Sequence, residues 1–192
     1  MTRTSPGKLI IISGPSGAGK STVVRRLLEK CPAPLVLSVS ATTRPPRPGE
    51  RDGVDYDFMS ADAFARYREA GEMLECFEVF GRGYWYGTPR LAVTTSLAEG
   101  KWVVLEIDVD GAQAVLREYP DAVTIFVTPG SMEELERRLR GRGTESEATI
   151  RRRLEVAGRE LDRAATYRHI VVNDRIERAV AEICDILTQH GD

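Results

Sequence analysis

Short apolar runs alternate with segments of helical periodicity along most of the 192-residue chain. Residues 102–107 and 122–127 are almost continuously apolar, as expected for strands of a sheet that is covered on both faces. Residues 8–13, 35–39 and 169–172 also have strand character. This alternation predicts an α/β fold in which a parallel five-stranded core sheet is flanked by helices.

Capping residues and apolar periodicity indicate where helices begin. A helix is expected from about Lys20, because apolar residues recur there at helical spacing before two prolines end the pattern. Ser131 with Glu134, and Thr144 with Glu147, have the spacing of a capping box, so a helix is predicted after each. The later helix has one apolar face, formed by Ile150, Leu154, Ala157, Leu161 and Ala165.

Residues 40–100 interrupt the alternation of strands and helices. The segment is rich in Pro, Gly and Tyr at first, and then has a helical pattern around 61–70 and a strand pattern around 73–79. We therefore expect a mixed α/β subdomain inserted into one domain. The core of that domain is expected to consist of residues 7–39, 101–136 and 156–192.

The charged residues exclude some classes of partner. The chain has 27 Lys+Arg and 29 Asp+Glu, and 23 of the cations are arginine. Residues 44–51 hold three arginines and one acid, and residues 137–153 hold seven arginines and two acids. This distribution indicates concentrated sites for small anions, and no basic face broad enough to bind a nucleic acid.

Apolar stretches and cysteines bear on the location of the protein. No stretch is long and apolar enough to span a membrane, and the first residues lack the apolar run of a signal peptide. Cys31, Cys76 and Cys184 are odd in number and widely spaced, which indicates neither a disulfide framework nor a zinc site. We expect a cytoplasmic protein with reduced cysteines and no membrane partner, and the oligomeric state stays open.

Residues 14–21 match the phosphate-binding pattern G-x-x-x-x-G-K-[ST], between an apolar strand and an apolar-periodic helix. Glycines let backbone N–H groups wrap around phosphates, and the following helix N-terminus adds favourable partial charge. Lys20 is expected to bridge the β- and γ-phosphates of a nucleoside triphosphate, and the hydroxyl of Ser21 to bind Mg²⁺. The predicted triphosphate-binding residues are Gly14, Pro15, Ser16, Gly17, Ala18, Gly19, Lys20, Ser21 and Thr22.

A second cationic loop lies in residues 38–58. Arg44 and Arg47 are three positions apart, and the neighbouring prolines restrict the conformation of the loop. The two guanidinium groups can therefore form a fork that clamps a phosphate monoester, to which Tyr56 can add a phenolic donor. The loop predicts a second ligand that carries a phosphate of its own.

The phosphate loop, the stretch 38–58 and a later Arg-Gly-x-Glu at 142–145 together resemble the guanylate kinase family. The resemblance extends from about Gly7 to the last predicted helix. It implies a P-loop NTPase fold with a GMP-binding subdomain at 40–100 and a short helical lid at 137–155. The activity that it implies is Mg²⁺-dependent transfer of a phosphoryl group from ATP to GMP, in purine nucleotide metabolism.

The resemblance also implies roles for individual residues. Glu75 matches the position that reads guanine, and an ionised carboxylate can accept from both the N1–H and the 2-amino group of that base. Asn173 matches a position that contacts the adenine of ATP, and Asp108 one that orients Mg²⁺ through water. The implied GMP-binding residues are Ser40, Arg44, Arg47, Glu50, Tyr56, Glu75, Tyr86, Thr88 and Glu106. The implied catalytic residues are Lys20, Arg44, Arg138, Arg142 and Arg153.

Other readings stay open at this point. A related P-loop kinase could act on another phosphorylated acceptor, such as a ribosyl bisphosphate, but it should lack the base-reading residues Glu75, Tyr86 and Thr88. A non-catalytic guanylate kinase-like interaction module should have a damaged P-loop, whereas residues 14–21 are intact. The remaining arginines of the lid segment are expected to face solvent or to form ion pairs: Arg137, Arg140, Arg151 and Arg152.

Overall fold

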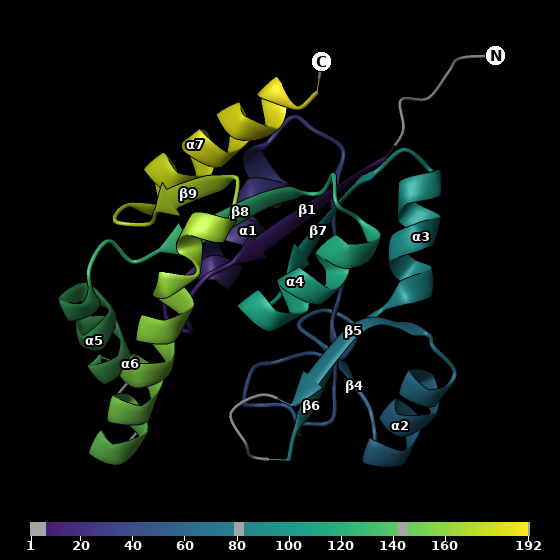
Figure 1. Ribbon diagram of the computed structural model, residues 1–192, viewed down its shortest axis with the longest axis horizontal. Coiled ribbons are helices and arrows are strands. Elements are labelled where there is room, and N and C mark those ends of the chain that lie inside the picture. The colour runs from purple at the N-terminus through teal and green to yellow at the C-terminus, as the bar shows by residue number, and fades with distance from the viewer. Residues whose placement is uncertain (1–6, 79–82, 142–145, 192) are drawn as a thin grey trace. The chain divides into compact units, whose positions relative to one another are not determined.

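The computed structural model describes residues 7–78, 83–141 and 146–191 (Figure 1). Its central sheet has five strands in the order β2-β7-β1-β8-β9. Strand β2 pairs with β7, and β8 with β9, both in parallel. The predicted parallel five-stranded sheet is thereby confirmed. The strands are β1 (Lys8–Ser13), β2 (Leu35–Leu37), β7 (Trp102–Glu106), β8 (Val123–Thr128) and β9 (His169–Val172).

The apolar runs form the inner strands because their side chains are buried on both faces of the sheet. Ile11 in β1, Val104 in β7 and Ile125 in β8 are fully buried, as are most of their neighbours. Burial of a side chain of this size contributes about 1.5–3 kcal/mol to folding. Strand β2 is shorter than predicted and ends at Leu37.

The chain folds into two compact units. The first comprises the residues up to Ile10, together with Leu35–Leu105 and Asp110–Ala122. The second comprises Ile11–Pro34, Glu106–Val109 and the residues from Val123 onward. The predicted division into core, subdomain and lid stays a prediction.

The first unit contains a second sheet, which has four strands in the order β4-β3-β6-β5. Strand β6 pairs antiparallel with both β3 and β5, and the predicted strand at 73–79 is confirmed as far as Glu78, because residue 79 lies outside the described residues. The predicted helix at 61–70 is confirmed as α2 (Ala61–Glu69), which packs Phe64 against Ala41 and Met73. The strands are β3 (Ala41–Thr42), β4 (Asp57–Phe58), β5 (Met73–Glu78) and β6 (Trp85–Pro89).

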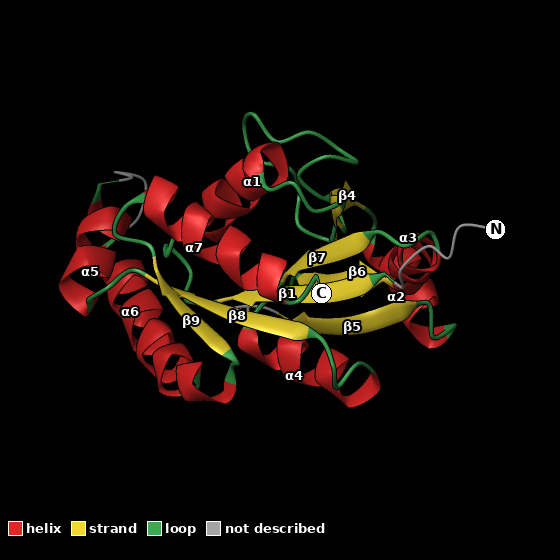
Figure 2. Ribbon diagram, turned by 90° about the horizontal axis from the view of Figure 1, so that it is seen from above, coloured by secondary structure: helices red, strands yellow, loops and turns green. Residues whose placement is uncertain are grey.

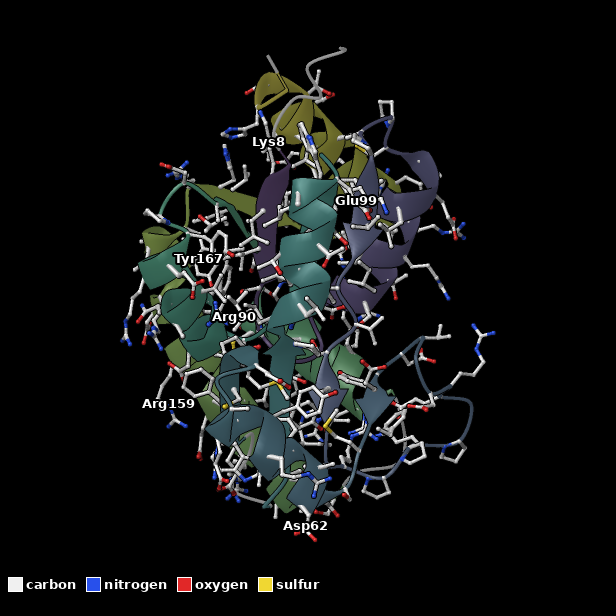
Figure 3. All side chains as sticks on the ribbon, turned by 90° about the vertical axis from the view of Figure 1, so that its right-hand side faces the viewer. Lys8, Asp62, Arg90, Glu99, Arg159 and Tyr167 are labelled. Atoms are coloured by element: carbon white, nitrogen blue, oxygen red, sulfur yellow. The ribbon has the colours of Figure 1, made fainter. Side chains whose placement is uncertain are left out.

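Two further helices, α3 (Arg90–Ala98) and α4 (Val109–Glu118), follow the second sheet and β7 respectively. Figure 3 shows Arg90 and Glu99 at opposite ends of α3. Helix α3 was not predicted, because its apolar residues do not gather on one face of the helix, and in the structure only Val93 of α3 is buried.

The helices of the second unit pack in pairs. Helix α1 (Lys20–Lys30) lies beside α7 (Ile176–Gln189), as Figure 2 shows. Helix α5 (Met132–Arg140) lies beside α6 (Glu147–Asp162), and the contact buries Leu135, Leu139, Ile150 and Ala157 (Figure 1). None of the helices in the described part of the chain is long and apolar enough to cross a membrane.

The start and end of α6 correct two predictions. Ser146 caps this helix, because its hydroxyl oxygen accepts from the backbone N–H of Thr149 at 3.3 Å. The prediction that Thr144 is the cap was wrong, since Ser146 lies closer to the apolar face and has an N3 donor within reach; Thr144 itself lies outside the described residues. Ala165 is exposed in a short 3₁₀ helix after α6, so the apolar face ends at Leu161.

Replacement of Leu139 tests the packing of α5 on α6. The side chain is 1% exposed, and Leu139→Ala is expected to lower the free energy of unfolding by about 2–5 kcal/mol, because it removes apolar contacts and leaves a cavity. Leu91→Ala is the matched control, since Leu91 is 76% exposed, and a change within about 0.5 kcal/mol is expected there. Urea unfolding of both variants measures the difference, and equal losses would contradict the packing.

Candidate functional site

The loop between β1 and α1 has the backbone that the phosphate-binding pattern predicts. Gly14 has a φ of +142°, and a Cβ atom there would lie 2.0 Å from the carbonyl oxygen of Val127, so only glycine fits. Gly19 is the residue before α1, and no side chain of the described residues caps the first turn of that helix. The free N–H groups and the partial positive charge of the helix end make this loop suited to phosphate.

Lys20 and Ser21 begin α1 and carry the polar groups of the loop. The ammonium group of Lys20 donates to the carbonyl oxygens of Gly14 at 2.5 Å and Pro15 at 3.2 Å, which holds it over the loop. The hydroxyl of Ser21 donates to Oε1 of Glu106 at 2.7 Å. The structure therefore brings Glu106, a residue that the resemblance assigns to GMP, into contact with the predicted Mg²⁺ ligand Ser21.

Glu106 is the last residue of β7, and Asp108 lies two residues after it. The backbone carbonyl oxygen of Asp108 lies 3.5 Å from the hydroxyl of Ser13, the residue directly before the loop. Because the ends of β1 and β7 meet here, the two predicted carboxylates belong to the same unit as the loop. This arrangement places acidic side chains at the carboxyl ends of strands, where α/β sheets bind their ligands.

A pocket of about 460 Å³ lies on the side of the loop that faces α5 and α7. Asn173, which follows β9, is 3% exposed in its wall, and its side-chain amide donates to the carbonyl oxygen of Ala18 at 2.7 Å. The side-chain amide of Asn173, which lies outside the phosphate-binding loop in sequence, thus helps to hold the backbone of that loop at Ala18. The residues around the pocket include Gly19, Thr22, Arg138, Asn173, Ile176 and Glu177.

The guanidinium group of Arg138 joins three parts of the second unit. It donates to Glu134 in α5 at 2.7 Å, to the carbonyl oxygen of Asn173 at 2.7 Å and to that of Ala18 at 3.3 Å. Hydrogen bonds from Arg138 and Arg137 hold the pKa of Glu134 below its usual range. Arg138, one of the implied catalytic residues, is therefore held beside the loop.

The other arginines of the segment 137–153 have different environments. Arg153 donates to the hydroxyl of Ser16 in the loop at 2.7 Å, whereas Arg142 lies outside the described residues. Arg137 pairs with Glu134, and Arg140 pairs with Glu136 and with Glu147, as expected. Arg151 and Arg152 are exposed.

Arg44 is the centre of the predicted phosphate clamp in the first unit. It is 8% exposed and makes two parallel hydrogen bonds to Glu50, at 2.9 and 3.0 Å, and a third to the hydroxyl of Tyr86 at 3.0 Å. Its guanidinium group lies over the ring of Tyr56. Burial alone would lower the pKa of Arg44, but the bonds to Glu50 and Tyr86 raise it above its ordinary value.

Glu50 is the counter-ion of this clamp. Burial favours its neutral form, but the hydrogen bond from Arg44 holds the pKa of Glu50 below its ordinary value. The carboxylate also accepts from the backbone N–H of Arg47 at 2.7 Å, while the side chain of Arg47 is exposed. Of the two arginines of the predicted clamp, Arg44 is therefore buried and Arg47 is exposed.

Glu75 and Thr88 lie opposite each other on β5 and β6. The Thr88 hydroxyl, which is fully buried, donates to Oε1 of Glu75 at 2.6 Å. Tyr86 lies two residues before Thr88 on the same strand, and Ser40 precedes β3, where its carbonyl oxygen accepts from Asp57 at 3.0 Å. The second sheet thus holds the predicted base-reading carboxylate, and the predicted phosphate clamp lies in the segment between its strands β3 and β4.

Arg90 supports this sheet and was missed by the sequence analysis. It begins α3, and its guanidinium group donates to the carbonyl oxygens of Gly71 at 3.2 Å and Met73 at 3.4 Å, and to the carboxylate of Glu118. These contacts fix the residues that lead into β5, the strand of Glu75. No sequence pattern marks such a residue, because only the fold brings its partners together: two carbonyl groups and the carboxylate of Glu118.

The glycine-rich loop after β1 of a parallel sheet defines a P-loop nucleotide-binding protein. The model of the guanylate kinase family matches residues 6–190. The guanylate kinase of Rhodopirellula baltica is 57% identical over 95% of this chain and 88% of its own length, and that of Myxococcus xanthus is 49% identical over 95% and 86%. The crystal structure of guanylate kinase from Anaplasma phagocytophilum matches with a TM-score of 0.80 and 35% identity, over 97% of this chain and 87% of that one. The chain belongs to the guanylate kinase family.

Proposed function

We propose that this protein transfers the γ-phosphoryl group of ATP to GMP, giving ADP and GDP. Membership of the guanylate kinase family supports this activity. GMP is favoured as the acceptor by one observation, the pair of Glu75 and Thr88 on neighbouring strands of the second sheet. The hydroxyl of Thr88 donates to Oε1 of Glu75 at 2.6 Å. The intact loop with Lys20 and Ser21 argues against a non-catalytic module.

Guanine recognition follows from the chemistry of this pair. The N1–H and the 2-amino group of guanine lie side by side, and the carboxylate of Glu75 can accept from both. Thr88 already donates to Oε1, which fixes the orientation of the carboxylate, and Ser40 is proposed to add a further contact. Adenine has an acceptor at N1 and no 2-amino group, so it would offer the carboxylate no donor in place of those of guanine, and this loss is costly.

The phosphate of GMP is proposed to bind at Arg44, Arg47, Tyr56 and Tyr86. The Arg44 guanidinium group is already oriented by Glu50, Tyr86 and the carbonyl oxygen of Pro45, which take four of its five N–H donors, and the remaining N–H on Nη2 is proposed to donate to a phosphate oxygen. The exposed side chain of Arg47 can approach the same phosphate from the loop.

The donor ATP is proposed to bind along the loop in the second unit. Backbone N–H groups of the loop, in which Pro15 has none and Ala18 already donates to Pro15, would hold its phosphates together with the ammonium group of Lys20. The pocket of about 460 Å³ between the loop, α5 and α7 offers room for the nucleoside, with Asn173 in its wall. Arg138 stabilises this arrangement because it links Ala18 to Asn173.

Mg²⁺ is proposed as the cofactor. The Ser21 hydroxyl and the Glu106 carboxylate, 2.7 Å apart, are the hard oxygen donors that this ion prefers, and Asp108 is proposed to act through water. When bound with ATP, the ion would neutralise charge on the β- and γ-phosphates. The described residues contain no cluster of three or more His, Cys, Asp or Glu that could hold a metal ion, so we expect Ser21 and Glu106 to act together with the triphosphate.

The chain's own contribution to catalysis is proposed to be positioning and charge neutralisation. The phosphate oxygen of GMP is an anionic nucleophile at neutral pH, so no side chain has to remove a proton from it. Lys20, Arg138 and Arg153 all contact the loop and can stabilise charge on the transferred group, and Arg142 is proposed to join them. Closure of residues 137–155 as a lid would exclude water that otherwise hydrolyses ATP.

The partners are proposed to be these two nucleotides, with no nucleic acid or membrane, in the cytoplasm. Two of the cationic side chains at the sites are paired with acids of the chain: Arg44 with Glu50 and Arg138 with Glu134. The formal net charge of −2 gives little attraction to a polyanion.

An assay of ADP formation with ATP and each of GMP, AMP, CMP and UMP tests the proposed function. Turnover is expected with GMP, with much lower rates for the others. Activity confined to AMP would overturn the guanine assignment, and activity with none of the four would favour a different phosphorylated acceptor.

Arg90→Ala is expected to raise the KM for GMP roughly 3- to 10-fold, because each lost hydrogen bond contributes about 0.5–1.5 kcal/mol and the start of β5 is no longer fixed. The KM for ATP and the kcat are expected to stay close to those of the parent. Arg117→Ala is the matched control, since Arg117 is an exposed residue beside Glu118 in α4. Steady-state kinetics with each nucleotide varied measure these values, and an equal rise in both KM values would contradict a local role.

A further inference from the structure

The hydroxyl of Thr42 bonds to backbone groups on both sides of the proposed phosphate clamp. Thr42 is the last residue of β3 and is fully buried. Its hydroxyl oxygen accepts from the backbone N–H of Arg44 at 3.2 Å, and the same hydroxyl donates to the carbonyl oxygen of Trp85, the first residue of β6, at 3.0 Å. One side chain thus joins the start of the loop that carries Arg44 to the strand that carries Tyr86.

Tyr86 holds the other end of the same arginine. Thr42 and Tyr86 are directly opposite each other in the antiparallel pairing of β3 with β6, so their side chains lie on the same face of the sheet. The hydroxyl of Tyr86 accepts from Nε of Arg44 at 3.0 Å. Arg44 is therefore held at its backbone by one of these partners and at its guanidinium group by the other.

The orientation of Arg44 matters because few of its donors are left for a ligand. Bonds to Tyr86, Pro45 and Glu50 take four of its five N–H donors. A hydrogen bond weakens steeply when the donor turns away from its acceptor, so a shift of the Arg44 backbone would misdirect the remaining N–H on Nη2. An arginine that is not held in place would also have to be ordered when the ligand binds, which lowers the affinity.

We propose that Thr42 is a positioning residue of the acceptor site, which holds Arg44 in the orientation that binds the phosphate of GMP. The role rests on the proposed transfer to GMP and adds a residue that the family resemblance does not assign. The O–H of Thr42 is already donated to Trp85, and its oxygen already accepts from Arg44, so we expect Thr42 to act through Arg44 and not to touch the nucleotide.

The affinity that the phosphate adds to the nucleoside tests this role. Guanosine has the same base as GMP and no phosphate, so the ratio of the two Kd values measures what the clamp contributes. Thr42→Val keeps the branched shape of the side chain without its hydroxyl, and we expect the Kd for GMP to rise roughly 5- to 30-fold. The Kd for guanosine should stay within about 2-fold of the parent value, because Glu75 and Thr88 are unchanged. Calorimetric titration measures both.

Two further variants separate positioning from a general loss of structure. Thr42→Ser keeps the hydroxyl and should restore the preference for GMP over guanosine. Thr124→Val is the matched control: Thr124 is 2% exposed in β8, and its hydroxyl accepts from the backbone N–H of Arg168 at 2.9 Å in the other unit. Its loss should lower the free energy of unfolding without a change in the Kd for GMP. Thr42→Ala replaces Thr42→Val should the valine variant fold poorly.

Steady-state kinetics give a second readout. The KM for GMP of Thr42→Val is expected to rise with the Kd, while the KM for ATP stays near that of the parent, because the proposed ATP residues belong to the other unit. Equal losses of affinity for GMP and guanosine, or the parent preference for GMP in Thr42→Val, would overturn the positioning role alone. A parent protein that binds GMP no better than guanosine, or does not phosphorylate it, would overturn the proposed function and the role of Thr42 with it.

Discussion

Lys20→Ala is expected to lower kcat by roughly 100- to 1,000-fold or more, because the variant lacks a cation that stabilises charge on the transferred phosphoryl group. GMP binding is expected to stay near that of the parent, because the proposed GMP residues belong to a different unit of the chain. Single-turnover kinetics measure the chemical step, and calorimetric titration measures the Kd for GMP.

Lys30→Ala is the control for this experiment. Lys30 is an exposed lysine in the last turn of the same helix, so its loss changes the charge of α1 without touching the loop. We expect its kcat to remain within about 2-fold of the parent, as for a surface substitution of small effect. A Lys20→Ala protein that keeps its parent turnover would show that the loop does not hold the phosphoryl donor.

Glu75→Ala is expected to lower kcat/KM for GMP by roughly 10²- to 10⁴-fold, because two hydrogen bonds to a charged acceptor are lost, each of about 1.5–3 kcal/mol. The KM for ATP should change little. Glu72→Ala is the matched control, since Glu72 is an exposed acid directly before β5. Steady-state kinetics of both variants measure the contrast, and a larger loss for ATP than for GMP would reverse the proposed division of the site.

IMP gives a sharper test of the same carboxylate. IMP lacks only the 2-amino group of GMP, so the parent protein should prefer GMP by the value of that one hydrogen bond. Glu75→Gln keeps the size of the side chain and a partner for Thr88, but its amide has a single oxygen acceptor. The preference for GMP over IMP is therefore expected to shrink in Glu75→Gln, and an unchanged ratio would mean that another group reads the amino group.

Several features of the fold follow from local patterns that sequence alone displays. Ile11, Val104 and Ile125 lie in apolar runs that are typical of buried strands, and the loop from Gly14 to Ser21 has a fixed spacing. Ser131 was correctly predicted as a cap, since its hydroxyl accepts from Glu134 three residues on. In each of these cases the pattern that makes the prediction lies within a short stretch of consecutive residues.

The contacts that the sequence did not predict join residues far apart in the chain. The bond from Ser21 to Glu106 depends on how β1 and β7 end, and the contact of Arg138 with Asn173 depends on where α5 lies beside the end of β9. Hydrophobic pattern and secondary-structure propensity do not show which residues far apart in the chain come into contact. Ser146 shows a different limit, because the capping-box pattern favoured Thr144 and the backbone of the folded helix instead places its first N–H groups within reach of Ser146.

The pair of Arg44 and Glu50 has a consequence for the protein in the absence of its ligand. An arginine as buried as Arg44 is costly without a negative partner, and a site built only for a phosphate would have to wait for its ligand. Here the chain provides its own carboxylate six residues later, on the same loop. The charge of Arg44 is therefore balanced within the chain itself, and we expect the loop around Arg44 to keep its structure in the absence of any bound phosphate.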